Sequence, residues 1–221
     1  MTEQILLDND VILKVARYSL VDEMLAAIPA DDATLGMLGV GRFVVRGRIE
    51  RDRRLADPAR ALAAFEELLA RTTLLEPTAD EIALAAQLEA EASRVDLELD
   101  GGESQLVAML ACRACCLLIT GDKRAVMAIS EVARHLAEGR IACLEQLVAQ
   151  IVARVGSARV RQAVCAEPTA DRALALCLGC GREAQPSDED VLAALASYSG
   201  DLGRTAPGTL LPGTDLSALA A

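Results

Sequence analysis

The residues best placed to do chemistry are acids that follow short apolar segments. Asp8 follows residues 5–7, and Asp122 follows Gly121 at the end of the apolar run 115–120. Each run is short and ends in turn residues, so both are predicted to be buried strands. Functional groups gather at the C-terminal ends of strands in open parallel sheets. The sequence therefore predicts that Asp8 and Asp122 lie at one edge of a sheet.

A third acid, Glu103, is expected in the first turn of a helix that opens at residues 100–102. It precedes an apolar stripe by one turn and shares the helix face that packs on the sheet. A carboxylate there is unfavourable unless it is paired, and three converging acids repel one another. A divalent cation removes that repulsion, and oxygen ligands favour Mg²⁺ or Mn²⁺ over zinc. Asp8, Glu103 and Asp122 are thus the predicted metal ligands.

Each of these acids also has a purely structural interpretation. Asp100 and Glu103 have the spacing of a reciprocal helix cap, while Asp8 and Asp122 are typical of turns after strands. Asp10 and Asp100 either support the metal ligands from outside or are solvated turn and cap residues. The coincidence of three acids at strand ends and on a core-facing helix favours a shared site.

The composition narrows the class of protein and of chemistry. The chain has 221 residues, a formal net charge of -11, 52% hydrophobic residues and 2% aromatic residues. An aliphatic core is therefore expected, whereas disorder and tight non-specific binding to nucleic acid are not. His135 is the only histidine, which excludes sites that need two imidazoles. The start of the chain and the longest apolar runs predict neither a signal peptide nor a membrane span, and we expect a cytoplasmic protein.

Strand and helix patterns alternate along the first part of the chain. Residues 72–75 are predicted to be a strand, and the Thr78–Glu81 spacing is that of a capping box that opens a helix ending near Ser93. This alternation favours an α/β domain with a mostly parallel sheet. We expect that domain at 1–138, a helical extension at 139–198 that includes helices over 142–155 and 171–178, and a Gly- and Pro-containing tail at 199–221.

Four segments together resemble the PIN-domain ribonuclease family. They are Leu6-Leu7-Asp8-Asn9-Asp10-Val11-Ile12-Leu13, Glu76-Pro77-Thr78-Ala79-Asp80-Glu81, the block that begins Leu99-Asp100-Gly101-Gly102-Glu103 and runs to Ala108, and Ile119-Thr120-Gly121-Asp122-Lys123-Arg124-Ala125. The match covers roughly the first 135 residues. Each motif is weak alone, and their order and spacing carry the resemblance.

The resemblance implies a three-layer α/β/α fold and a metal-dependent ribonuclease, in which acids at the edge of the sheet hold Mg²⁺ or Mn²⁺ and activate water against RNA. Asp8, Glu103 and Asp122 match the family's acids, and Thr120 matches a hydroxyl residue that often precedes the last one. The family's usual second acid has only Glu50 as a candidate in residues 41–50. The family also suggests a toxin-like role with an inhibitory partner protein.

A basic segment is the best candidate for an RNA-contacting surface. Residues 42–60 hold seven arginines against three acids in an otherwise acidic chain. The alternative is a solvated helix face whose arginines pair with neighbouring acids. No interleaved aromatic platform is expected, so stacking on single-stranded bases has little support. The candidate RNA contacts are Arg42, Arg46, Arg48, Arg51, Arg53, Arg54 and Lys123.

The seven cysteines are expected to be reduced thiols, because their number is odd and no secretory context is present. Two Cys-x-x-Cys spacings, Cys112–Cys115 and Cys177–Cys180, leave a four-cysteine zinc site open. The first pair lies in an apolar stretch where cysteine acts as a small hydrophobic residue. The second has glycines that suit a metal knuckle.

Two other functions remain open. A PIN-like domain that has lost one ligand could act as a scaffold, with the apolar stripe of residues 141–155 binding a partner or a second copy of the chain, or packing on its own domain. Asp8 and Asp10 also resemble the nucleophile and acid–base pair of haloacid-dehalogenase-like phosphatases. That family expects a further acid soon after Gly121-Asp122, and residues 123–127 contain none.

Overall fold

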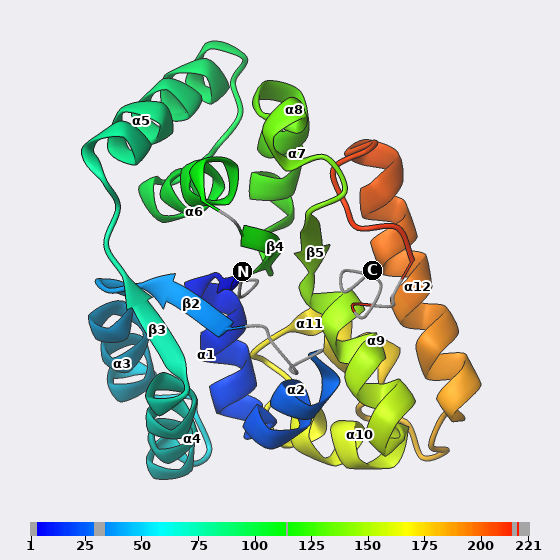
Figure 1. The fold of residues 1–221 in the computed structure, drawn as a ribbon. Coiled ribbons are helices and arrows are strands. Elements are labelled where there is room, and N and C mark those ends of the chain that lie inside the picture. Colours follow the sequence, from blue (N-terminus) through cyan, green and yellow to red (C-terminus); the bar gives the residue numbers. More distant parts are fainter. Residues whose placement is uncertain (1–3, 29–33, 114, 214–215, 217–221) are drawn as a thin grey trace.

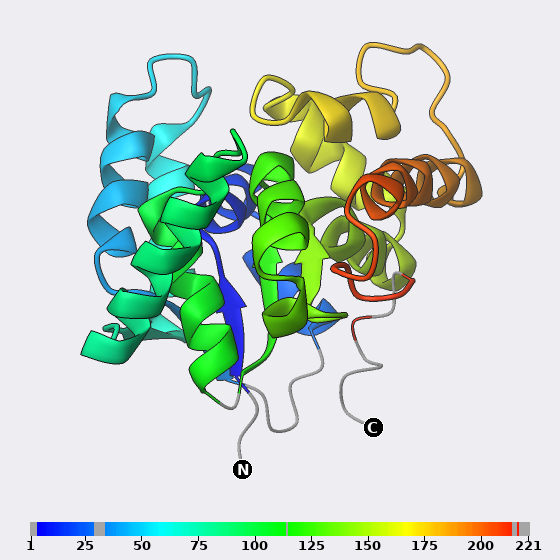
Figure 2. The ribbon, with the colours of Figure 1, turned by 90° about the horizontal axis from the view of Figure 1, so that it is seen from above.

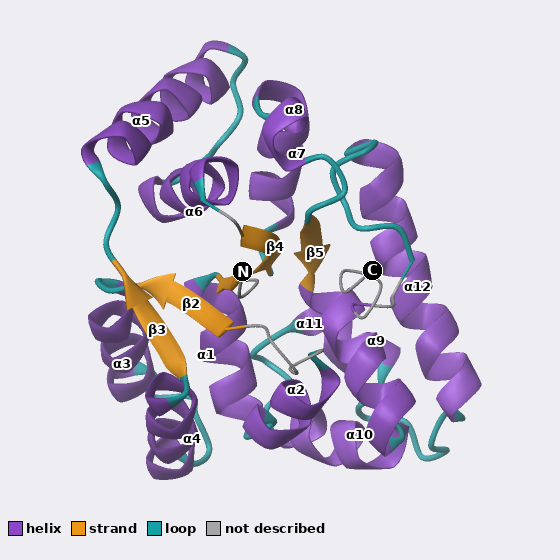
Figure 3. Ribbon diagram, viewed as in Figure 1, coloured by secondary structure: helices purple, strands orange, loops and turns teal. Residues whose placement is uncertain are grey.

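The computed structural model describes residues 4–28, 34–113, 115–213 and 216, and its centre is a five-stranded parallel sheet (Figure 3). The strands lie in the order β3-β2-β1-β4-β5. Their bounds are β1 (Gln4–Leu7), β2 (Thr34–Leu38), β3 (Thr72–Leu75), β4 (Cys115–Thr120) and β5 (Ile141–Cys143). The strands expected at 5–7, 72–75 and 115–120 are confirmed, and so is the parallel α/β fold.

Helices cover both faces of the sheet and give three layers (Figure 1). One layer holds α1 (Asn9–Tyr18), α2 (Val21–Ala27), α3 (Gly41–Arg51), α4 (Pro58–Ala70), α9 (Leu144–Val155), α10 (Ser157–Ala166) and α11 (Arg172–Cys177). Figure 2 looks onto the other layer, which holds α5 (Ala79–Arg94), α6 (Gly101–Cys112), α7 (Lys123–Val132) and α8 (Arg134–Ala137). The long α12 (Asp188–Thr205) packs beside α9. None of the described helices is long and apolar enough to cross a bilayer.

The two layers follow from the alternation of side chains along the central strands. Ile5 and Leu7 of β1 point into the core beneath α1 and α9, whereas Leu6 points into the core beneath α6 and α7. Successive residues of a strand face opposite sides of the sheet, so a continuously apolar strand is stable only when both faces are covered.

Side-chain caps define where the helices beside the site begin. Thr78 and Glu81 form a capping box at the start of α5, and Asp100 and Glu103 form another at the start of α6. In each box the first side chain accepts from a backbone N–H of the first turn while the glutamate accepts from the cap residue. The predicted start of each helix is confirmed.

The chain after residue 138 contributes to the same sheet and core. Residues 141–143, expected at the start of a helix, form β5, which pairs with β4 on one side and with Leu210 on the other. The apolar stripe of α9 is buried in the core shared with α1 and α2, so it packs on its own domain. The segment expected to be a tail from residue 199 is helical as far as Thr205.

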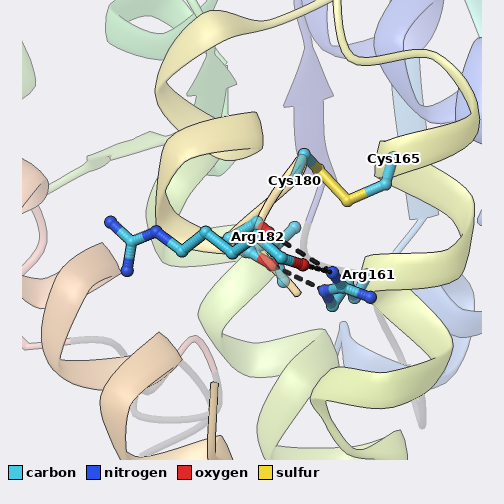
Figure 4. The surroundings of a disulfide bond; sticks show 6 residues. Arg161, Cys165, Cys180 and Arg182 are labelled. Carbon is cyan, nitrogen blue, oxygen red and sulfur yellow. Dashed lines mark hydrogen bonds between the residues drawn. A yellow bond between two sulfur atoms is a disulfide. The ribbon is translucent and has the colours of Figure 1, made fainter. Parts of the chain in front are cut away.

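A disulfide corrects the expectation that all cysteines are reduced. Cys165 at the end of α10 is bonded to Cys180, which follows α11, with the two Cα atoms 5.3 Å apart (Figure 4). The Arg161 side chain holds the same turn by donating to the carbonyl oxygens of Leu178, Gly179 and Arg182. Because Cys180 is bonded to Cys165, the knuckle expected from Cys177 and Cys180 does not form.

We expect Cys165→Ser to destabilise the oxidised protein. The bond spans 15 residues of sequence, and loop-closure entropy assigns a cross-link of that span about 3 kcal/mol. Urea denaturation without reductant measures the free energy of unfolding. Cys112→Ser is the matched control, since Cys112 is an exposed free thiol. Equal stability of the two variants would contradict a stabilising disulfide.

Candidate functional site

A pocket of about 480 Å³ lies where β1 and β4 end, and it gathers the acids that the sequence singled out. The sheet order places β2 on one side of β1 and β4 on the other, so the order of strands reverses here. In open α/β sheets ligands bind in the crevice at such a point. The polar and charged lining comprises Asp8, Asn9, Asp10, Arg48, Asp100, Glu103, Gln105 and Asp122.

Asp8 is the most deeply placed of these acids, with 7% of its surface exposed. It occupies the position before α1, and its backbone N–H donates to the Ile119 carbonyl of β4 over 3.0 Å. The Thr120 hydroxyl donates to its Oδ2 over 3.2 Å. Burial, and then repulsion by Asp10, raise the pKa of Asp8 to about 6, although the bond from Thr120 opposes the rise. Thr120 therefore supports Asp8 rather than lining the pocket.

Glu103 lies opposite in the first turn of α6 and is 9% exposed. Its Oε2 accepts from the Asp100 backbone N–H over 3.1 Å, while Oδ1 of Asp100 accepts from the N–H groups of Gly102 and Glu103. Burial is the main reason that the pKa of Glu103 is raised to about 8, and repulsion by Asp100, Asp122 and Asp8 adds to it. Glu103 is thus both a helix cap and a member of the acidic pocket.

Asp122 caps α7, and it keeps its negative charge to a lower pH than Asp8 and Glu103 do. Its Oδ1 accepts from the backbone N–H groups of Arg124 and Ala125, and its Oδ2 lies 3.3 Å from Nη2 of Arg124. Partial burial raises the pKa of Asp122, but the hydrogen bonds from Arg124 and Ala125 outweigh that effect and hold the pKa below its usual value. Asp122 therefore caps α7, as the turn interpretation expects, and it also lines the pocket.

A lysine that the sequence interpretation missed joins the pocket to the C-terminal region. Lys14 lies 2.6 Å from Asp10 and 2.7 Å from Asp171, which caps α11. The i, i+4 spacing of Asp10 and Lys14 was a local signal for the first contact. Gly121 makes room for this arrangement, because a Cβ atom there would collide with the Asp10 carboxylate. Asp10 is therefore paired rather than freely solvated.

Only part of the expected basic surface reaches the pocket. Arg48 lines it, and Arg42 lies over the Phe43 ring at the start of α3. The remaining side chains lie outside the lining. Arg46 pairs with Glu66, and Arg51 donates to the Gly47 carbonyl oxygen. Lys123 pairs with Glu145 and lies over the Tyr198 ring. The remaining candidates are exposed, and they are Arg53, Arg54 and Glu50.

The acids share a pocket, but their carboxylates are not close enough together to form a set of metal ligands. Within residues 4–28, 34–113, 115–213 and 216, no group of three or more His, Cys, Asp or Glu side chains is arranged to hold a metal ion. The same holds for the described cysteines, so Cys112, Cys115, Cys177 and Cys180 do not form a four-cysteine zinc site. The pocket is therefore a concentration of carboxyl groups.

We expect Glu103→Gln to change how stability depends on pH. The pKa of Glu103 rises from 4.5 to about 8 on folding, so between these values the folded chain binds more protons and loses stability as the pH rises. The free energy of unfolding of variant and parent should be measured by thermal or urea unfolding at pH 5 and at pH 9. From pH 5 to pH 9 the difference between them should change by more than about 1 kcal/mol in favour of the variant. Glu91→Gln, on the exposed side of α5, should show no such change. A gap that is independent of pH would contradict a charge effect.

Comparisons of the chain with protein-family models, with curated proteins and with solved structures found no match.

Proposed function

We propose that the chain is a Mg²⁺- or Mn²⁺-dependent ribonuclease of the PIN type, acting at the acidic pocket. The observation that carries the proposal is the meeting of Asp8, Glu103 and Asp122, which come from the end of β1, the start of α6 and the end of β4. Acids from three separate elements line one crevice at the reversal point of the sheet. Helix capping explains Glu103 and Asp122 individually, but it does not explain why they share a crevice with a buried Asp8.

The donor set fits a hard divalent cation. Asp8, Glu103 and Asp122 offer oxygen only, and their mutual repulsion is the kind of unfavourable charge that a cation offsets. The hydrogen bonds described above engage Oδ2 of Asp8 and Oε2 of Glu103, whereas both oxygens of Asp122 have partners in Arg124 and Ala125. A bound Mg²⁺ or Mn²⁺ would supply a more acidic water and would stabilise charge on phosphoryl oxygens.

Residues in and around the pocket orient the acids, and one of them is placed to contact the substrate. Thr120 fixes the Asp8 carboxylate, and Asp100 fixes Glu103 through the capping box. Lys14 holds Asp10 at the rim, which limits the negative charge that an RNA phosphate would meet. Arg48 is the cation in the lining and is the candidate phosphate contact. Glu50 does not line the pocket, so the proposed site works with three acids.

A second candidate function is a binding module without catalysis. Two observations favour it: Arg124 already pairs with Asp122, and the described acids do not form a ready ligand set. In such a protein the pocket would bind a cationic group of a partner instead of a metal ion. The two functions differ in their response to metal, which makes the following test decisive between them.

We expect Mn²⁺ to bind the parent chain and to bind Asp8→Asn and Asp122→Asn at least tenfold more weakly, about 1.4 kcal/mol. Asparagine removes the charge yet remains a good helix cap, so α7 should still form in Asp122→Asn. Calorimetric titration measures the affinity, and circular dichroism checks the fold. Asp80→Asn, in the first turn of α5 outside the pocket, is the matched control.

The same proteins should be incubated with a mixed RNA pool and Mn²⁺. Cleavage by the parent and the control, with loss in both pocket variants and in EDTA, is the expected result. If the folded parent neither binds Mn²⁺ nor cleaves RNA, the nuclease proposal is wrong and the binding module remains as the candidate function. Metal binding without cleavage would retain the site and remove RNA as its substrate.

A further inference from the structure

The start of α3 carries an exposed apolar patch beside the acidic pocket. The patch consists of Val40, Phe43 and Val44, and Phe43 keeps 63% of its surface exposed. Val40 and Val44 also line the pocket that holds Asp8 and Glu103. Apolar side chains that gather beside a cavity and are rimmed by polar residues mark interaction sites. The patch is therefore continuous with the proposed site.

The ring of Phe43 is held in place and remains accessible. The Arg42 guanidinium lies over the ring, 4.5 Å from its centroid. On a helix the residue four positions later lies against the same stretch of surface, and here that residue is Gly47, which has no side chain to cover the ring. Arg42 thus lies against the ring of a side chain that keeps most of its surface exposed.

Phe43 is also exceptional among the aromatic residues, all four of which lie in the described part of the chain. Phe65 and Tyr18 are buried in the core. Tyr198 is half-buried, and Lys123 lies over its ring, 4.8 Å from the centroid. A protein that has so few aromatic residues and exposes one at its acidic pocket has a surface suited to a flat ligand.

Both arginines and the acids of the pocket lie near the patch, and the arginines suit a polyanion with flat groups. Arg42 lies at one side of the patch, and Arg48 lies one turn beyond Val44 in the lining of the pocket. Proteins bind single-stranded nucleic acid by combining cations that contact the backbone with aromatic rings on which bases stack. A base-paired duplex keeps its base faces stacked internally and offers no free face to Phe43.

We propose that Phe43, supported by Arg42, is a nucleobase-stacking subsite that selects unpaired RNA for the acidic pocket. The inference rests on the proposed ribonuclease function, because it places a substrate base next to the same pocket. It also revises the expectation from sequence that stacking on bases has little support. That expectation came from the scarcity of aromatic residues, whereas the structure exposes one of them beside the candidate site.

The test is binding of a short uridine-rich RNA, single-stranded or annealed to its complement, measured by fluorescence anisotropy at low salt in EDTA. EDTA prevents the proposed metal-dependent cleavage, so affinity is read alone. Phe43→Ala should weaken single-strand binding about tenfold, and Phe43→Tyr should retain the parent affinity because it keeps a stacking ring. Duplex affinity should be weaker than single-strand affinity and unchanged by Phe43→Ala.

The control is Ile82→Ala, which removes another exposed apolar side chain, one that is 50% exposed. Ile82 lies away from the pocket. Its neighbour Glu81 contacts Arg113 at the C-terminal end of α6, at 2.6 Å, whereas Glu103 of the pocket lies at the N-terminal end of the same helix. The control should bind RNA like the parent. Circular dichroism on every variant separates lost affinity from lost fold.

Equal single-strand affinity of Phe43→Ala and the parent would overturn the subsite, and so would a parent that binds no RNA. If Phe43→Ala changes the oligomeric state of the protein and leaves its RNA affinity unchanged, the patch is a contact between protein molecules, and the subsite is overturned. Cleavage in Mn²⁺ with affinity that is independent of Phe43 retains the nuclease and removes the subsite. Affinity that depends on Phe43 without cleavage supports the subsite and removes the nuclease.

Discussion

The parallel pairing of β1 with β4 at the centre of the sheet is the constraint on which the candidate site depends. The Asp8 N–H bonds the Ile119 carbonyl, and the Thr120 hydroxyl bonds the Asp8 carboxylate while accepting from the Asp122 N–H. These bonds fix the ends of two strands that are more than a hundred residues apart in sequence. The apolar residues of both strands are buried on both faces, so a slip by one residue would move each side chain into the differently packed core on the opposite face. The fixed register of β1 and β4 in turn fixes the positions of Asp8 and Asp122, which follow these strands.

Charge works against the fold at the same place. Glu103 and Asp8 lose solvent and face other carboxylates, so their pKa values rise well above the usual range. Such groups reduce stability at neutral pH, and burying them is unfavourable without compensation. Capping bonds and the Thr120 hydroxyl offset part of that cost. Sites that bind ligands commonly retain such unfavourable groups, because a bound ligand of opposite charge offsets their repulsion.

The C-terminal region is integrated into the domain and contacts Lys14, the residue that pairs with Asp10 of the pocket. Strand β5 extends the sheet, and α9 fills the core under α1 and α2. Between α10 and α11, the Glu167 carboxylate accepts from the Ala56 N–H, and Asp171 pairs with Lys14. The disulfide between Cys165 and Cys180 closes the loop that carries both acids. The ion pair that holds Asp10 of the pocket therefore includes a residue far from the motifs of the first part of the chain.

The sequence by itself determined the features that depend on neighbouring residues. It located the strands at 72–75 and 115–120, the capping boxes at Thr78 and Asp100, and the acids at strand and helix ends, because burial patterns and caps are local. It missed β2 and β5. The three residues of β5 become a strand only through their partners in β4 and Leu210. Likewise only the tertiary structure decided that Arg48 lines the pocket while Arg46 pairs with Glu66, that Lys14 meets Asp171, and that Cys180 bonds Cys165. Those choices depend on how distant segments pack, and no periodicity in the chain encodes them.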